Sequence, residues 1–229
     1  MKVAIVGTGK SGGLLTQLIN QGDIVGPFNS KNPPTPEALS KADVIITFTS
    51  AEVFASLVPI FLESKTPVVS AATGFDYSSE LAKTIKDQKL KWLYASNFSM
   101  GVNLLRRVLK TLNAAKEILN SPSIRIEETH HIHKLDAPSG TALSMKDWLG
   151  LDAEMISHRE GDVVGIHTLL IESEYEMISL THKAKNRKLF ASGAIWAAEY
   201  FCKNIKAPGL YSFDDVLDDY FETLQETHS

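Results

Sequence analysis

The side chains best suited to chemistry lie between residues 127 and 142, where the sequence reads E-E-T-H-H-I-H-K-L-D-A-P-S-G-T-A. His130, His131, His133 and Lys134 occur here together with three carboxylates, all within ten residues. Histidine changes its charge near neutral pH, so it suits proton transfer by general acid or base catalysis. Lysine adds a compact positive charge that holds a carboxylate or gives up a proton. The segment therefore predicts acid-base chemistry on an anionic molecule.

The four residues from Pro138 to Thr141 predict the start of a helix. Ser139 is the expected N-cap, because its side-chain oxygen can accept a hydrogen bond from a backbone N–H of the first turn. The remaining N–H groups at a helix N-terminus attract anions. An acid, a cation and an anion cradle are thus predicted within twelve residues.

Three other interpretations of this segment stay open. If the preceding strand continued, His131 and His133 would share one face and could ligate a metal, with further ligands from Glu or a distant His. The histidines could equally belong to a solvated polar loop. Lys134 and Asp136 could simply form a surface ion pair that contributes little stability.

A second motif, G-x-G-x-x-G, spans residues 7–12 directly after the apolar run 3–6 and directly before a helical pattern. Gly7 permits a tight turn, Gly9 lets the backbone approach a pyrophosphate, and Gly12 lets helix and strand pack closely. This context predicts dinucleotide binding, with a purely structural turn as the alternative. The candidate residues of the loop are Gly7, Thr8, Gly9, Lys10, Ser11 and Gly12.

The cofactor preference depends on the end of the next strand. An acidic residue about 20 positions after the glycines grips the ribose 2′-hydroxyl of NAD, but no acidic residue lies between Asp23 and Glu37. Asn29, Ser30 and Lys31 would instead donate to a 2′-phosphate, so the sequence favours NADPH over NADH. An exposed polar loop would explain the same residues.

The elements that must position these motifs change in character near residue 97. Before it, short β-branched runs alternate with helical patterns, which is typical of βαβ units and a parallel sheet; the strands are expected at 3–6, 24–25, 44–48, 68–70 and 92–95, and the helices at 12–21, 51–64 and 78–88. After it, the pattern indicates an α+β region, with strands at 124–128, 165–171 and 177–182 and helices at 102–119, 139–148, 190–202 and 213–224.

Composition narrows the class of protein. Lys and Arg number 23 against 27 Asp and Glu, a net charge of -4 that argues against nucleic-acid binding. The single cysteine, Cys202, excludes an intramolecular disulfide. No run approaches the 18 apolar residues of a membrane span. We therefore expect a soluble cytoplasmic protein with a small-molecule substrate and neither nucleic acid nor membrane as partner.

The segment H-H-x-x-K-x-D-A-P-S-G-T-A, at residues 130–142, resembles the signature of the 4-hydroxy-tetrahydrodipicolinate reductase family, also called dihydrodipicolinate reductase. Three further stretches resemble family motifs: A-S-N-F-S-M-G-V-N at 95–103, R-E-G-D-V-V-G-I-H-T at 159–168 and L-T-H-K-A at 180–184. With the glycine loop, the matches run from residue 3 to about residue 194 in the family's order.

The resemblance implies an α/β fold in two domains. Residues 1–101 and 206–229 would form a Rossmann domain that binds NADH or NADPH. Residues 102–205 would form an inserted α+β domain with a mixed sheet, which binds the substrate and builds a homotetramer. The implied activity is reduction of 4-hydroxy-tetrahydrodipicolinate, a cyclic imine dicarboxylate, to tetrahydrodipicolinate in diaminopimelate and lysine biosynthesis.

The resemblance also implies roles for individual residues. His130 would donate and accept the proton, Lys134 would be the second proton donor, and no metal is expected. The implied substrate contacts are His131, Ser139, Gly140 and Thr141. Two further loops would line the nicotinamide, through Ala71, Ala72, Thr73, Ala95, Ser96, Asn97 and Phe98.

The chain departs from the family pattern at several positions. The loop after the fourth strand reads A-A-T-G at residues 71–74 instead of G-T-T-G, and Trp196 follows S-G-A-I where the family often has Arg. The alternatives to this reductase are another Rossmann oxidoreductase of the aspartate family, a metal-dependent hydrolase built on the histidines, and a nucleotide-sensing module without catalysis. The first shares the glycine loop but lacks the histidine segment.

Overall fold

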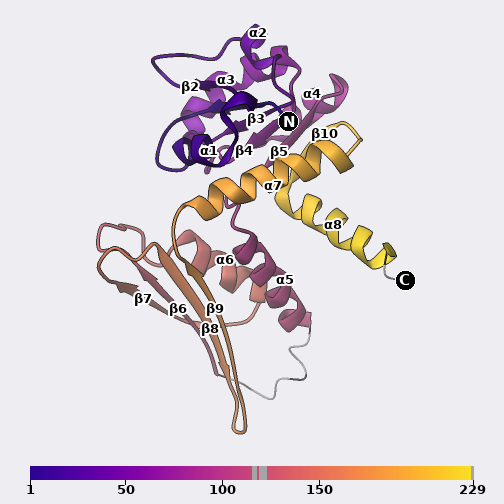
Figure 1. Cartoon of the computed structure of the whole chain (residues 1–229). Coiled ribbons are helices and arrows are strands. Elements are labelled where there is room, and N and C mark those ends of the chain that lie inside the picture. The colour runs from indigo at the N-terminus through magenta and orange to yellow at the C-terminus, as the bar shows by residue number, and fades with distance from the viewer. Residues whose placement is uncertain (115–117, 119–122, 228–229) are drawn as a thin grey trace. The chain divides into compact units, whose positions relative to one another are not determined.

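The structure of the protein is a computed structural model that describes residues 1–114, 118 and 123–227. The chain forms two compact units, which Figure 1 shows with their elements labelled. Unit 1 contains residues 1–98 and 188–229, and unit 2 contains residues 99–187.

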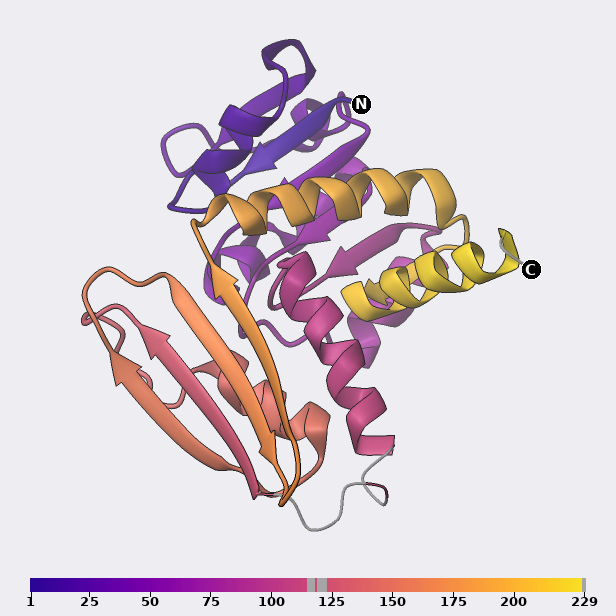
Figure 2. The same cartoon turned by 60° about the horizontal axis from the view of Figure 1, so that its bottom comes forward.

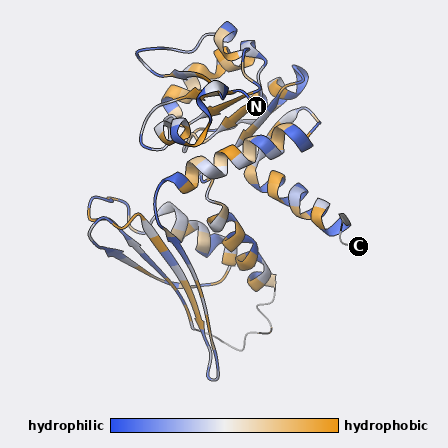
Figure 3. Cartoon of the chain, viewed as in Figure 1, coloured by the Kyte–Doolittle hydropathy of each residue, from blue (hydrophilic) through white to orange (hydrophobic). Residues whose placement is uncertain are grey.

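Unit 1 is built on a parallel sheet of six strands in the order β10-β5-β4-β3-β1-β2. Apart from Ser70, the central strands consist of β-branched and apolar residues, and they are buried along their whole length, as expected for a sheet covered on both faces. Figure 3 colours most of this sheet as hydrophobic. The strands are β1 (Val3–Val6), β2 (Ile24–Phe28), β3 (Val44–Thr47), β4 (Val68–Ser70), β5 (Lys91–Tyr94) and β10 (Gly209–Ser212).

Helices connect and cover these strands. Four of them begin directly after a residue whose hydroxyl accepts a backbone N–H of the first turn, namely Thr35, Ser50, Ser78 and Ser212. One core cluster packs Phe54 and Phe61 edge-on against Trp92 of the sheet. The helical segments are α1 (Gly12–Leu18), η1 (Gln21–Asp23), α2 (Pro36–Leu39), α3 (Ala51–Ser64), α4 (Ser79–Asp87), α7 (Lys188–Asn204) and α8 (Phe213–Thr227).

Helix α7 belongs to unit 1, whereas the sequence analysis placed residues 102–205 together in the second domain. The chain passes from unit 2 back to unit 1 after residue 187, because α7 packs against α1, β3 and β4 of unit 1. Gly193 explains how closely it packs, since a Cβ at this position would lie 1.8 Å from the backbone oxygen of Phe98. Trp196, on the same helix, packs in an aromatic cluster with Tyr200 and Tyr220.

Unit 2 is a mixed sheet of four strands in the order β7-β6-β8-β9. Strands β6 and β7 are parallel, and the other two pairs are antiparallel. Figure 2 shows the sheet with two helices on one side, and the residues buried on that side alternate along β6 and β8. The strands are β6 (Ser123–His130), β7 (Glu154–Arg159), β8 (Gly165–Glu172) and β9 (Met177–Ala184), and the helices are α5 (Met100–Ala114) and α6 (Gly140–Leu149).

The predicted fold class, a Rossmann-type parallel sheet with a separate mixed sheet, is confirmed. The predicted helix 102–119 corresponds to α5, and its residues 115–117 and 119 lie outside the described residues. Strands β7 and β10 were not predicted, because each carries only two strongly apolar side chains. No helix in the described ranges is both long and apolar enough to cross a bilayer.

Gly193→Ala tests the close contact of α7. The added methyl group would overlap the Phe98 carbonyl, so we expect the free energy of unfolding to fall by about 1–3 kcal/mol. Urea denaturation measures this change. Ser192→Ala is the control, because Ser192 is exposed on the same helix; equal stability of the two variants would contradict the packing described.

Candidate active site

The covered face of the unit 2 sheet is apolar along most of its length and polar at one end. Its apolar part includes Ile126, Leu169 and Ile171, which pack with α5 and α6. At the polar end the strand register places Glu128 opposite His167, and His167 opposite His182. Residues of one face alternate along a strand, so His130 lies on this face too.

Glu128 is the most buried ionisable group of this end, with 1% of its side chain exposed. Both carboxylate oxygens accept from the backbone N–H of Ser139 at 3.0 Å, and Oε1 accepts from Nη2 of Arg159 at 3.2 Å. Burial raises the pKa of this carboxyl, but hydrogen bonds from Ser139, Ser157 and Arg159 outweigh burial and leave the pKa below its ordinary value. Glu128 is therefore a buried carboxylate anion.

His130 is held from both sides of its ring. Nδ1 donates to the carbonyl oxygen of Val164 at 3.1 Å, while Nε2 lies 3.3 Å from Nε2 of His167 and 3.6 Å from Oε2 of Glu128. Burial lowers the pKa of His130, and the Glu128 charge partly opposes this effect. The ring is consequently neutral at pH 7 in the free protein, with its lone pair on Nε2.

His167 is even more deeply placed. Burial is the main cause that lowers the pKa of His167 to about 4. Its Nε2 lies 3.1 Å from Oγ of Ser139, and within the described part of the chain its Nδ1 has no hydrogen-bond partner.

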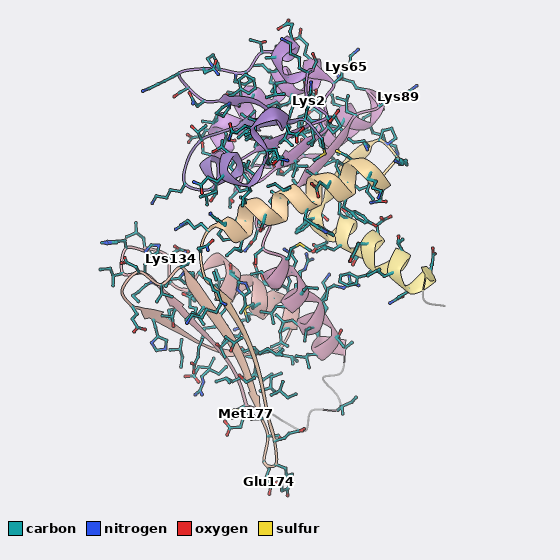
Figure 4. The ribbon with its side chains drawn as sticks, viewed as in Figure 1. Lys2, Lys65, Lys89, Lys134, Glu174 and Met177 are labelled. Atoms are coloured by element: carbon teal, nitrogen blue, oxygen red, sulfur yellow. The ribbon has the colours of Figure 1, made fainter. Side chains whose placement is uncertain are left out.

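Arg159 ties the loop that carries Lys134 to this buried site. Besides the Glu128 carboxylate, its guanidinium donates to the carbonyl oxygens of Lys134 and Asp136. Lys134, labelled in Figure 4, donates to both carboxylate oxygens of Asp136 at 2.8 Å, and this contact is the main cause that lowers the pKa of Asp136. The surface pair considered in the sequence analysis is thus present.

The predicted N-cap at Ser139 is confirmed. Its Oγ accepts from the backbone N–H of Ala142 at 3.2 Å, and α6 begins at Gly140. The N–H of Ser139 donates to the Glu128 carboxylate. The next backbone N–H groups at the start of α6, those of Gly140 and Thr141, have no intrahelical acceptor. Gly140 is exposed and Thr141 half-buried.

The histidines do not pair as the metal interpretation predicted. Strand β6 ends at His130, so His131 and His133 follow it in the loop, with ring centroids 6.3 Å apart.

In the part of the chain that the structure describes, the residues within metal-ligand distance of one another are Glu128, His130 and His167, whose ligand atoms all lie within 4.8 Å of one another. A metal on Nε2 of His167 would force its proton onto the unpartnered Nδ1, whereas metal-binding histidines normally donate from their second nitrogen. The cluster fits a hydrogen-bonded network better.

The glycine loop of unit 1 forms a separate site. Gly7 has φ 91°, and a Cβ there would lie 2.3 Å from the Phe48 oxygen. A Cβ on Gly12 would lie 2.0 Å from the Gly7 oxygen, whereas one on Gly9 would meet nothing within 4 Å. The loop borders a pocket of about 230 Å³, lined by Gly9, Lys10, Ser11, Gly12, Phe48, Thr49 and Ala71.

The turn after β2 touches the same loop. Asn29 closes the turn by accepting from the N–H groups of Lys31 and Asn32, and its Nδ2 donates to Oγ1 of Thr8 at 3.4 Å. Ser30 and Lys31 are exposed.

The two loops predicted near the nicotinamide follow β4 and β5. Ser70 joins them, since its backbone oxygen accepts from Ala95 and its Oγ from Ala72. Of the remaining predicted residues, Thr73 and Ser96 are exposed, Asn97 is half-buried, and Phe98 is buried. The Phe98 ring packs against Phe213, so this side chain belongs to the core.

Comparison with known proteins finds one family over nearly the whole chain. Residues 1–98 match the family model described as "Dihydrodipicolinate reductase, N-terminus", and residues 101–217 match "Dihydrodipicolinate reductase, C-terminus". The chain belongs to the dihydrodipicolinate reductase family.

Curated relatives of this reductase family carry the name 4-hydroxy-tetrahydrodipicolinate reductase. The relative from Bdellovibrio bacteriovorus is 39% identical over 181 residues, covering 76% of either chain. The relative from Christiangramia forsetii is 32% identical over 241 residues, covering 97% of this chain and 100% of the relative.

A solved structure shares the fold. It is the dipicolinate-bound dihydrodipicolinate reductase from Paenisporosarcina sp. TG-14, with a TM-score of 0.74 and 21% identity, covering 94% of this chain and 98% of the other. Since both halves of the chain match one reductase family, the hydrolase and the other aspartate-family oxidoreductase are not favoured.

Sequence reasoning assigned no role to five residues of these sites, namely Glu128, Arg159, His167, Phe48 and Thr49. Arg159 and His167 stand in the R-x-G-D-x-x-G-x-H-T stretch, which was the available signal for them. Phe48 and Thr49 follow β3, whose carboxyl end lies at the same edge as the glycine loop.

The buried histidine predicts how stability depends on pH. A histidine whose folded-state pKa lies below its ordinary value binds fewer protons folded than unfolded, so unfolding becomes easier as the pH falls. With the pKa of His167 lowered from 6.5 to about 4, we expect the unfolding free energy to decrease by up to about 3 kcal/mol between pH 6.5 and pH 4.

His167→Gln should flatten this dependence, because glutamine does not titrate. Urea unfolding at a series of pH values measures it, with the exposed His158→Gln as the control. The same slope in His167→Gln and the unchanged protein would refute the assignment.

Proposed function

We propose that the chain catalyses NAD(P)H-dependent reduction of 4-hydroxy-tetrahydrodipicolinate to tetrahydrodipicolinate in diaminopimelate and lysine biosynthesis. Its family membership supports the reaction, since both family models and the curated relatives carry the reductase name. The observation that carries the proposal is the polar end of the unit 2 sheet. There the ring of His130 is fixed by hydrogen bonds, next to the loop of Lys134 and the start of α6.

The nucleotide site of unit 1 fits the cofactor of this family, which is NADH or NADPH. Gly7 and Gly12 leave no room for a Cβ, while Gly9 leaves open space beside a pocket at the start of α1. In the proposal, residues 7–12 hold the pyrophosphate, and the loops 71–73 and 95–98 lie at the nicotinamide. The bound cofactor supplies a hydride to the substrate.

His130 acts as the proton donor in this reaction. After loss of water the substrate has a conjugated double bond. A hydride added at one carbon leaves negative charge on the neighbouring carbon, which must then be protonated. The proton leaves from Nε2 of His130, because Nδ1 is held by the Val164 carbonyl oxygen. Two substrate carboxylates near His130 favour its protonated form, which burial disfavours in the free protein.

In the proposal, groups around His130 bind the substrate. Lys134 exchanges Asp136 for a substrate carboxylate and is the second candidate, after His130, for donating the one proton that the reaction takes. The amides of Gly140 and Thr141 hold the other carboxylate. His131 is half-buried, with Nδ1 lacking a hydrogen-bond partner among the described residues, so it is available to contact the substrate. Ser139 acts by capping α6.

In this assignment unit 1 binds the dinucleotide and unit 2 binds the substrate. Unit 2 also forms the homotetramer through the open face of its sheet, where Thr168 and Thr181 pair across strands β8 and β9. Light scattering of the purified protein distinguishes a tetramer from a monomer.

The role of His130 predicts a specific kinetic defect. General acid catalysis is commonly worth about 100-fold to 10,000-fold in rate, so His130→Gln should lower kcat by at least about 100-fold while changing KM little. Thr141→Val should mainly raise KM. Absorbance at the nicotinamide band, with enzymatically generated substrate, measures both parameters. His158→Gln is the control, and an unchanged kcat in His130→Gln would reject the assignment.

We propose NADPH as the preferred cofactor, since Asn29, Ser30 and Lys31 offer donors and no carboxylate. Lys31→Glu should then raise the KM for NADPH about tenfold, the cost of roughly 1.4 kcal/mol of lost binding, and leave the KM for NADH nearly unchanged. Lys86→Glu, an exposed charge reversal on α4, is the control. Equal kcat/KM for both cofactors in the unchanged protein would contradict this preference.

A further inference from the structure

The covered face of unit 2 holds more buried polar groups than the proposed reaction uses. Glu128, His167 and His182 lie opposite one another on three adjacent strands, and His130 lies on the same face. Glu128 and His167 are both buried, with 1% and 6% of their side chains exposed. A buried ion and a buried neutral imidazole disfavour folding unless their contacts compensate, so their presence beside His130 calls for a reason.

The hydrogen bonds fix which nitrogen of His130 exchanges its proton. The carbonyl oxygen of Val164 can only accept, so Nδ1 keeps its proton in both charge states of the ring. Proton exchange therefore occurs at Nε2. In the described part of the chain, polar atoms close to Nε2 include Nε2 of His167 at 3.3 Å and Oε2 of Glu128 at 3.6 Å.

The tautomer of His167 follows from its surroundings. A proton on Nδ1 would be a buried donor without a partner among the described residues, so the proton belongs on Nε2. There it donates towards the lone pair of His130 Nε2 or to Oγ of Ser139. When it donates to His130, neutral His167 holds the neutral His130 ring in place.

Charged groups from several elements face the two histidines. Lys134 of the loop and Arg159 of β7 oppose protonation of His130, and Glu128 of β6 favours it. His182 of β9, together with His130 and Lys134, opposes protonation of His167, while Glu128 favours it. The carboxylate of Glu128 is accordingly the charged group that stabilises a proton on His130, and the hydrogen bond to Val164 adds to this effect.

We propose that Glu128 and His167 are positioning residues for proton transfer by His130. His167 fixes the ring through its Nε2 contact, and Glu128 stabilises the protonated ring before the proton leaves for the substrate carbon. The inference rests on the proposed function for the identity of the substrate. After transfer His130 is neutral, its Nε2 lone pair again accepts from His167, and solvent returns one proton per turnover.

Glu128→Gln tests the electrostatic part. An opposite charge within about 4–6 Å shifts a pKa by 1–3 units, so removing the Glu128 charge should lower the pKa of His130. The pH above which activity is lost should then fall by about one unit. The pH profile of kcat/KM measures this shift. Glu127→Gln is the matched control, because Glu127 lies on the opposite face of β6 and pairs with Arg125; its profile should stay in place.

His167→Leu and His167→Gln test the positioning part. The glutamine amide nitrogen can take the place of Nε2 and donate to His130, whereas leucine cannot. Misplacement of a reacting group by about 1 Å can cost 100-fold, so we expect kcat to fall about 10-fold to 100-fold in His167→Leu with KM little changed, and glutamine to restore most of it. Equal losses in both variants would overturn the positioning role.

A measurement without substrate separates this inference from the proposed function. Titration of the His130 ring by nitrogen-15 NMR in the free protein should show a lower midpoint in Glu128→Gln and an unchanged one in Glu127→Gln. If this shift occurs but the substrate is not reduced, the proposed function fails and the electrostatic role of Glu128 stands. If the substrate is reduced and neither titration nor pH profile moves, the inference is overturned. Should Glu128→Gln fail to fold, the two His167 variants decide.

Discussion

A buried carboxylate organises the candidate active site. Glu128 has 1% of its side chain exposed, and such an ion is tolerated only if several donors replace the water it loses. Its donors come from the start of α6, through Ser139, and from β7, through Arg159. One charge thereby ties together three segments that are distant in sequence.

The same charge links structure to chemistry. Arg159 pairs with Glu128 and also donates hydrogen bonds to the carbonyl oxygens of Lys134 and Asp136, so it fixes the loop that carries the lysine. His130 is the last residue of the strand that contains Glu128, so the sheet fixes the backbone position of the proposed proton donor. The end of the strand and the loop after it carry the proposed chemical groups, and the buried ion fixes their positions.

Local patterns allowed much of the fold to be predicted. The predicted strand 44–48 and the glycines at 7 and 12 have local causes, because a doubly covered strand must be apolar and the turn leaves no room for a Cβ at these two positions. Strand β7 escaped prediction since its E-M-I-S-H-R sequence carries little periodicity. The assignment of α7 to unit 1 depends on contact with β3 and β4, which no local pattern reveals.

The candidate site was predicted in part for the same reason. His130, Lys134 and Ser139 are neighbours in sequence, and their chemistry is visible in the residue types. His167 reaches His130 only through the register of β6 with β8, a pairing across 37 residues. Glu128 was visible as a carboxylate, but its burial and its pairing with Arg159 come from the folded sheet.

The central claim is that one hydrogen of the product comes from the cofactor and its neighbour from the protein's acid. Reduction with cofactor deuterated at the transferred position, in ordinary water, and with ordinary cofactor in heavy water tests it directly, with mass spectrometry and NMR of the product. We expect one deuterium from the cofactor in the first case and, in the second, one solvent deuterium fixed at the adjacent carbon. A product without cofactor deuterium would contradict the account.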